Sequence, residues 1–306
     1  MNDPTNQQNL NTDPGQPSGQ SSRKPSWQTI VALLFFIGTI ASLLMYRYGT
    51  THNFFNYDDI DFSDWEQKGK EMNIAFYTFW RNCELFHFLV PLIGYSLLYK
   101  LASNKSARLF VILTVIGTLV GMVFTVIYYQ NIISQFTSDS NINETLSAIV
   151  GCGWIASELC CIYAFSVLLA DKCLSAKSKS WIGILLLRWI LVLLIAVSNL
   201  VTGGMQTVFN ETTAAMSSSG DSKLSYLDFY QNSGLYPTLW QILTLIIAFA
   251  LWHMARSEAF SKPYDPTQPI RLSPVNKWMG AAAACAALVT VGLYLLYTTV
   301  LSEFFI

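Results

Sequence analysis

The sequence predicts an all-α integral membrane protein: a polytopic transmembrane helix bundle of about seven spans, with the N-terminus inside and the C-terminus outside. Only 12% of the 306 residues are charged, 52% are hydrophobic and the mean hydropathy is +0.38. A soluble domain carries roughly a quarter charged residues. The apolar residues also form long continuous blocks instead of stripes with a helical period. The lipid bilayer is therefore the expected environment and partner.

The first 26 residues form a segment of their own. They are rich in Asn, Gln, Pro, Gly and Ser and contain almost nothing apolar. Such a segment cannot bury enough surface to offset its ordering entropy, so we expect a disordered polar cytoplasmic tail at 1–26. The first apolar block begins too late and is too long for a cleavable signal peptide. Residues 27–306 are then the transmembrane bundle.

The apolar blocks define the expected spans. A helix needs about 20 residues to cross the hydrocarbon core, and five of the blocks meet this length comfortably. The block at 235–254 is weaker, because Pro237 lies near its start and His253 near its end. The second block reaches the required length only if its helix starts near residue 73 and carries Arg81 and Glu84 inside. We expect spans near 27–46, 73–99, 109–129, 146–169, 181–201, 235–254 and 279–301.

The distribution of basic residues predicts the orientation, because an excess of Lys and Arg marks cytoplasmic connectors. The connector 130–145 contains no basic residue, and the connector 202–234 contains only Lys223. The connector 47–72 is predominantly acidic. The pattern predicts insertion in a plasma membrane, the inner membrane if the host is bacterial. The basic residues of the tail and of the alternate connectors are Arg23, Lys24, Lys100, Lys105, Arg108, Lys172, Lys177, Lys179, Arg256, Lys262, Arg271 and Lys277.

Small residues inside the blocks predict close helix packing. Gly117 and Gly121 form a GxxxG pattern, and residues 280–287 are a run of small side chains. Small residues let transmembrane helices approach each other where no hydrophobic force drives them together. This pattern supports a bundle and says nothing about its partners.

Ionisable residues inside the blocks are the candidate site, because each costs about 2.5 kcal/mol or more at the bilayer centre. Glu158 lies roughly 18 Å and Arg188 roughly 10 Å from the cytoplasmic ends of adjacent antiparallel blocks, so the two can pair. One interpretation is a structural pair that holds the helices in register. The other makes Glu158 a proton or cation site, with Arg188 holding its charge or binding an anionic ligand. Asn199 falls on nearly the same helical face as Arg188.

A second polar group lies in the doubtful block. Arg81, Glu84 and His87 are spaced three apart, which places them along one flank of a helix. They form either an outer interface cluster, with Arg81 snorkelling and Glu84 paired to it, or a deeper site. In the second case His87 joins Glu158 in a relay, because imidazole titrates near physiological pH. Pro91 is expected to kink the helix and to open a polar pocket there.

The sequence predicts no catalytic residue, metal site or cofactor. Glu84 and His87 have the spacing of carboxylate–imidazole metal ligands, but neither His52 nor His253 has a matching carboxylate. The six cysteines form no CxxC pair, and the usual protease, hydrolase and nucleotide-binding patterns are missing. A net charge of −1 offers no basic field for nucleic acid.

These observations leave two functional hypotheses ahead of the rest. The first is transport or permeation of a small solute or ion, with Glu158 at the centre and Arg188, His87 and Asn199 lining the site. The alternative is a non-catalytic membrane scaffold or sensor whose buried charges are structural pairs. A membrane-embedded enzyme ranks third, because the sequence contains too few polar residues that could converge on one catalytic site.

Overall fold

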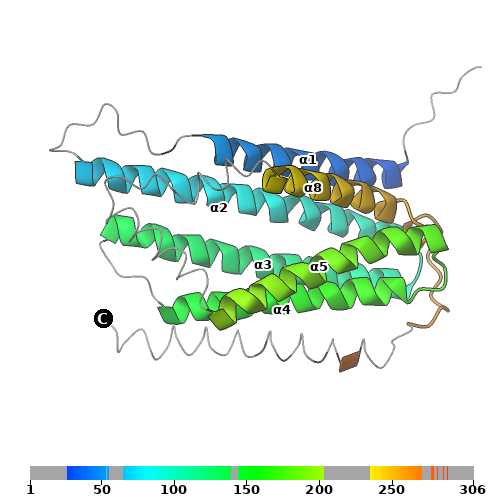
Figure 1. Ribbon diagram of the computed structural model, residues 1–306. Helices are drawn as coiled ribbons and strands as arrows, with labels where there is room; N and C mark the ends of the chain where they lie inside the picture. The colour runs from blue at the N-terminus through cyan, green and yellow to red at the C-terminus, as the bar shows by residue number, and fades with distance from the viewer. Residues whose placement is uncertain are drawn as a thin grey trace, which may run out of the picture.

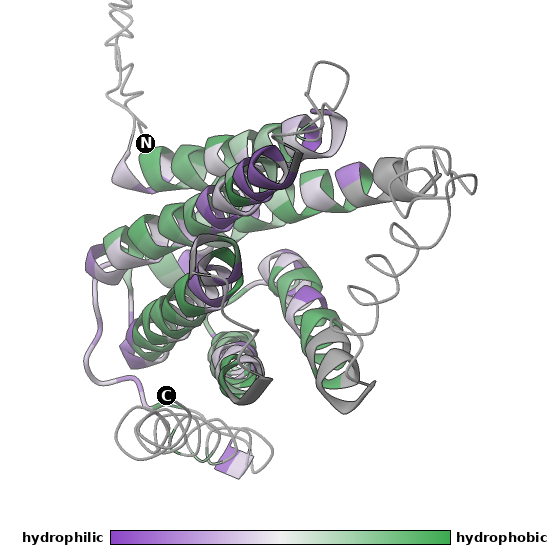
Figure 2. Cartoon of the chain, turned by 90° about the vertical axis from the view of Figure 1, so that its left-hand side faces the viewer, coloured by the Kyte–Doolittle hydropathy of each residue, from purple (hydrophilic) through white to green (hydrophobic). Residues whose placement is uncertain are grey.

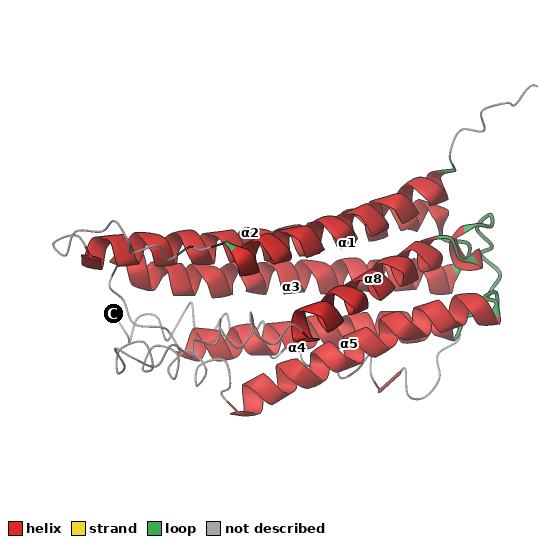
Figure 3. Cartoon of the chain, turned by 45° about the horizontal axis from the view of Figure 1, so that its top comes forward, coloured by secondary structure: helices red, strands yellow, loops and turns green. Residues whose placement is uncertain are grey.

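The computed structural model describes residues 26–52, 54, 65–138, 144–202 and 235–270, together with positions 277, 278, 281, 285 and 288. Within these residues all regular structure is helical (Figure 3), which confirms the all-α prediction for this part of the chain. Two short 3-10 helices, η2 (Tyr99–Leu101) and η3 (Glu258–Phe260), lie in the connectors. The long helices are α1 (Trp27–Thr51), α2 (Trp65–Leu98), α3 (Lys105–Ser138), α4 (Glu144–Leu169), α5 (Ala176–Thr202) and α8 (Leu235–Ala255).

The six long helices of the described residues pack as a ring of neighbours. Along the chain, α1 packs against α2, α2 against α3, α3 against α4 and α4 against α5. Helix α8 then packs against both α5 and α1, which closes the ring. The helices lie side by side along one common direction (Figure 1). Because the ring is closed, each helix presents one face to the interior and another to the surroundings.

The short connectors between helices gather at one end of the bundle, on the right of Figure 1. We call this the connector end and define it by residues 26–28, 99–104, 170–175 and 256–270. The backbone N–H of Ser103 donates to the Ala259 carbonyl at 2.8 Å, and the N–H of Asp265 donates to the Ser103 carbonyl at 2.7 Å. The Gln28 side chain donates to the Ser257 carbonyl at 3.3 Å. Segments far apart in sequence are thus fastened to one another here.

Three of the described helices are long and apolar enough to cross a membrane: α1, the 105–137 stretch of α3 and the 146–169 stretch of α4. Hydrophobic residues predominate along the helices (Figure 2). Ile37 and Leu194 on their surfaces are each 60% exposed, as lipid-facing side chains are, whereas soluble proteins avoid large exposed apolar patches. These features fit a membrane protein. Residues 1–25 of the predicted tail lie outside the described residues, as does most of the predicted span 279–301.

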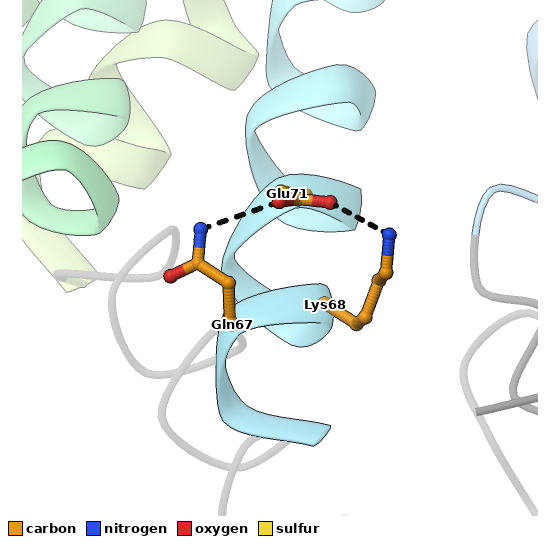
Figure 4. Close-up of polar contacts among 3 residues, drawn as sticks. All are labelled: Gln67, Lys68 and Glu71. Carbon is orange, nitrogen blue, oxygen red and sulfur yellow. Dashed lines mark hydrogen bonds and ion pairs between the residues drawn. The ribbon is translucent and has the colours of Figure 1, made fainter. Parts of the chain in front are cut away.

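Helix α2 covers the doubtful second block. It runs from Trp65 to Leu98 without interruption and carries both Arg81 and Glu84 inside, and it is not among the three described helices that are long and apolar enough to cross a membrane. Pro91 lies within the helix, and the predicted kink does not interrupt it. The helix starts earlier than predicted because its first turns carry side-chain pairs at helical spacing. Glu71 accepts from Gln67 at 3.2 Å and from Lys68 at 3.3 Å (Figure 4).

The close approach predicted for Gly117 and Gly121 is confirmed between α3 and α4. A Cβ atom at Gly117 would lie 2.8 Å from Cys161 Sγ, and one at Gly121 would lie 2.9 Å from Ser157 Oγ. The Ser157 hydroxyl donates to the Gly117 carbonyl at 2.7 Å. The missing side chains therefore allow an interhelical hydrogen bond that a larger residue would prevent.

Aromatic rings fill the interior next to the connector end. Tyr95 lies 5.2 Å from Phe35 and 5.8 Å from Phe110, measured between ring centroids. Phe110 in turn lies 5.0 Å from Phe165 and 6.0 Å from Phe260. All five side chains are 2% exposed or less. We call these five residues the aromatic core; they come from α1, α2, α3, α4 and η3, and they close the interior of the ring on this side.

Candidate functional site

The candidate site is built around Arg188, which extends from α5 across the interior of the ring. Its Nη2 atom lies 3.4 Å from the Nε2 atom of His87 on α2. Helices α2 and α5 are not neighbours in the ring, so this contact spans the space that the ring encloses. The guanidinium carbon also lies 4.5 Å from the centroid of the Trp189 ring, within the range of a cation–π interaction.

Two carboxylates share the field of this one guanidinium. Arg188 interacts electrostatically with Glu84 on α2 and with Glu158 on α4. Among the described residues, no ion pair of 4.0 Å or less joins Arg188 to either carboxylate. We call Glu84, His87, Glu158 and Arg188 the interior cluster. The interior cluster brings ionisable groups from α2, α4 and α5 into one region, where neither carboxylate forms an ion pair with Arg188.

Glu158 has the most unfavourable environment in the interior cluster. Its Oε2 atom is buried and has no hydrogen-bond partner. A buried polar atom without a partner costs about 1–3 kcal/mol, and more for a charged group. Native structures retain few such groups, and each calls for a physical explanation. In a membrane-embedded region the usual explanation is a functional site.

The structure brings together three of the four predicted site residues and adds one. Glu158, Arg188 and His87 lie in the interior cluster, but the hydrogen-bonding neighbour of Arg188 is His87 and not Glu158. Glu84, expected as a partner of Arg81, interacts with Arg188 instead, and within the described residues no ion pair joins Arg81 to Glu84. The backbone of Asn199 belongs to α5, but its side chain lies outside the described part. Within that part, no group of three or more His, Cys, Asp or Glu residues could hold a metal ion.

Sequence reasoning missed a group of tyrosines from α2 and α3. Tyr77 of α2 stacks on Phe136 of α3, with ring centroids 5.8 Å apart. The Tyr128 ring lies 5.3 Å from that of Tyr129 and 5.1 Å from that of Trp154, centroid to centroid. We call Tyr77, Tyr128 and Tyr129 the tyrosine cluster. Adjacent tyrosines late in one span and a tyrosine early in the preceding antiparallel helix are the sequence signal that could have found it, because such positions lie at the same level of a bundle.

Comparisons with family models, with curated proteins and with solved structures find no match to this chain. The function is therefore argued from the geometry of the interior cluster and from the chemistry of its side chains.

Proposed function

We propose that the chain is a multi-pass membrane protein of about seven spans that transports or conducts a small solute or ion through the interior cluster. Glu158 is the central binding group, and Arg188, His87, Glu84 and Asn199 line the site. The single observation that carries this proposal is the meeting of two carboxylates, a guanidinium and an imidazole across the ring without a direct ion pair between Arg188 and either carboxylate.

The same charges can be read as structural, and the geometry favours the transport interpretation. A structural pair in an apolar interior gains its stability from short, hydrogen-bonded contact between the two charges. Glu158 has no such contact with Arg188, and one of its oxygens has no partner. A proton or cation site needs a carboxylate that is free to exchange its partner. The unpaired Glu158 fulfils this requirement.

The distribution of charge supports the proposed orientation. Basic residues at the connector end and in the adjoining first turns of α3 and α5 are exposed: Lys100, Lys105, Lys172, Lys177, Arg256 and Lys262. Excess base marks the cytoplasmic side of a membrane protein, so the connector end is the inner side in this proposal. The N-terminus of α1 belongs to the same end. The location that we propose is the plasma membrane, which is the inner membrane if the host is bacterial.

The experiment is a flux measurement in proteoliposomes at matched protein incorporation. Wild-type vesicles are compared with Glu158→Gln vesicles for proton, sodium and potassium flux, and a panel of small solutes follows. The matched control is Glu71→Gln. Hydrogen bonds from Gln67 and Lys68 lower the pKa of Glu71, so it is charged at neutral pH, yet it lies before the predicted span, on the outer surface of α2. We expect flux in the wild type and in Glu71→Gln, and its loss in Glu158→Gln.

The scaffold alternative rests on one observation, the Arg188 contact with His87 that links α2 to α5. It predicts tight vesicles for every variant and a lower folded yield for Glu158→Gln and for Arg188→Gln. It also predicts that the double variant restores the yield, because removing both charges leaves no unpaired group. Flux that depends on Glu158 would exclude this alternative.

A further inference from the structure

We infer that an acidic phospholipid binds along the outside of α3, with its phosphate at Lys105 and Arg108 and its acyl chains on the exposed apolar face that follows. The inference goes beyond the proposed function, because a lipid site on the outer surface of the bundle requires the membrane character of the chain and not a transport role. Three features carry it: an arginine that is held without an acidic partner, an excess of unpaired base around it, and an apolar stripe that continues from it.

Arg108 lies in the first turn of α3, against the rings of two tyrosines. Its guanidinium carbon lies 3.5 Å from the ring centroid of Tyr264 and 5.3 Å from that of Tyr99. Among the described residues, no ion pair of 4.0 Å or less joins Arg108 to a carboxylate, and its buried Nε atom has no hydrogen-bond partner. The cation–π contacts hold the guanidinium in place, and a guanidinium is suited to binding two phosphate oxygens at once. Arg108 is therefore a positioned cation that lacks an anionic partner within the described chain.

The acidic side chains at the connector end are already engaged by neutral donors. Asp171 accepts from an asparagine amide at 2.6 Å, Glu258 from a serine hydroxyl at 2.7 Å and Asp265 from a threonine hydroxyl at 2.6 Å. Within the described residues none of these acids forms an ion pair, and residues 1–25 contain two acidic and two basic residues, which supply no net counter-charge. The exposed bases left without one are Lys100, Lys105, Lys172, Lys177, Arg256 and Lys262. Each base near an anionic membrane surface strengthens binding by about fivefold.

An exposed apolar stripe continues from Arg108 along the outside of α3. Steps of three or four residues place side chains on one face of a helix, and Lys105 and Arg108 begin such a series. The apolar members that follow are each 38% exposed or more: Ile112, Ile116, Leu119, Val123 and Val126. The other face of the helix is packed into the bundle, where Phe110 and Val111 are 1% exposed or less. A positive group at the head of an apolar stripe matches the amphipathic form of a phospholipid, whereas a free phosphate or a soluble acidic protein would leave the stripe unused.

The position of Arg108 along the bundle fits the headgroup level of a bilayer. The connectors gather at this end (Figure 1), and Trp27 and Tyr99 beside them are 67% and 42% exposed, as aromatic residues at a membrane–water interface are. From Arg108 to Val126 the helix rises roughly 27 Å, close to the hydrocarbon thickness of about 30 Å. Acidic lipids are concentrated in the cytoplasmic leaflet. Assignment of the site to that leaflet rests on the orientation in the proposed function.

The test is lipid retention by the full-length protein, measured by native mass spectrometry from mixed micelles with equal amounts of phosphatidylglycerol and phosphatidylcholine. We expect the wild type to retain phosphatidylglycerol at least about tenfold more than phosphatidylcholine, because several bases act together. Lys105→Gln/Arg108→Gln should reduce this preference at least about fivefold. The matched control is Lys68→Gln/Lys70→Gln, which removes two bases from the opposite end, where they pair within α2, and should keep the preference.

Two further variants separate the head position from the stripe. Ile112→Ser/Ile116→Ser should retain about threefold less phosphatidylglycerol, because apolar contact with the acyl chains is lost, and should keep the preference for the acidic headgroup. If the Arg108 variant fails to fold, Lys100→Gln/Lys105→Gln decides instead, since both side chains are exposed. It should lower the preference at least about fivefold.

Several outcomes would overturn the inference. Retention of the two lipids in equal amounts by monodisperse wild-type protein would do so, and so would an equal loss of preference in the Lys68→Gln/Lys70→Gln control. Displacement of phosphatidylglycerol by an equal concentration of inorganic phosphate would point to a free-anion site instead. A preference for phosphatidylglycerol without any flux would remove the transport role and keep this site, whereas Glu158-dependent flux without a lipid preference would do the reverse.

Discussion

The two ends of the bundle are held together in different ways. At the connector end, long-range hydrogen bonds join segments that are far apart in sequence. Asn104 donates to Asp171 at 2.6 Å, and the Cys173 thiol donates to Gln268 at 3.1 Å. At the opposite end, the ion pairs among the described residues are Lys68–Glu71 and Lys70–Glu66, which lie within one helix and on its surface. Such local, exposed pairs stabilise a helix slightly and join nothing else.

The long-range bonds make the connector end a firmly fastened part of the described chain. Buried bonds between separate segments must all break for the connector end to move, and elements with few such bonds are the first to open locally. Asn104 illustrates the point, because its Oδ1 atom also accepts from the Ala107 N–H at 2.9 Å and so caps the start of α3. The connector end therefore holds the helices at fixed positions.

The largest effect should follow from opening the aromatic core. Phe110→Ala removes a ring that is fully buried and contacts three other aromatic side chains. We expect a loss of about 3–5 kcal/mol in the free energy of unfolding, measured by reversible unfolding in mixed micelles. The control is Phe249→Ala, since Phe249 is 49% exposed and should cost much less. Similar losses for the two variants would mean that the core does not close the connector side.

The next largest effect should come from the polar network of the connector end. Asp171→Ala removes the acceptor of the Asn104 amide and of the Cys173 N–H, the latter at 2.9 Å. Because Asp171 is only 6% exposed, the donors left behind are desolvated, and we expect a loss of about 2–3 kcal/mol. Thermal unfolding followed by circular dichroism measures it, with the exposed neighbour Lys172→Ala as control. A loss below about 0.5 kcal/mol would show that this network does not fasten the end.

A glycine pair tests how closely the helices pack between the two ends. At Gly121 a Cβ would lie 2.9 Å from both Phe88 and Ser157, whereas at Gly183 no atom outside its own helix backbone lies within 4 Å. Gly121→Ala should therefore cost about 1–2 kcal/mol through overpacking. Gly183→Ala should stabilise its helix by up to about 1 kcal/mol. Both changes are measurable in the same unfolding assay, and equal effects would contradict the close approach of α3 and α4.

The smallest effect concerns acid stability at the connector end. Hydrogen bonds from the Thr267 hydroxyl and backbone lower the pKa of Asp265 below its ordinary value of 3.8. A lowered pKa in the folded state stabilises the protein above the ordinary pKa, and this contribution is lost as the pH falls through the native pKa. Asp265→Asn should thus lower the unfolding temperature slightly at pH 6 and less at pH 3. A difference that grows with acidity would contradict this assignment.

Parts of the candidate site could be predicted from sequence, and other parts could not. Glu158, Arg188 and His87 stand out because an ionisable residue inside an apolar block is conspicuous wherever the chain folds. We expected a contact between Arg188 and Glu158 because helices that are adjacent in the sequence were assumed to pack against each other. The structure instead gives Arg188 a partner on α2, because a closed ring brings α5 opposite to α2 and a long guanidinium side chain can cross the interior.

The sequence by itself determined the helical class, the membrane character and the close packing at Gly117, whereas α2 begins eight residues before the predicted span 73–99 and α3 ends nine residues after the predicted span 109–129. These follow from composition and local spacing, which act on each segment separately. Tertiary structure alone decided which helices are neighbours, how the connector end is fastened, and that Arg188 contacts His87. The physical reason is that uniformly apolar helices carry almost no information about which face meets which partner. The choice of neighbouring helices depends on a few glycines, buried amides and charges that contact residues far away in the sequence.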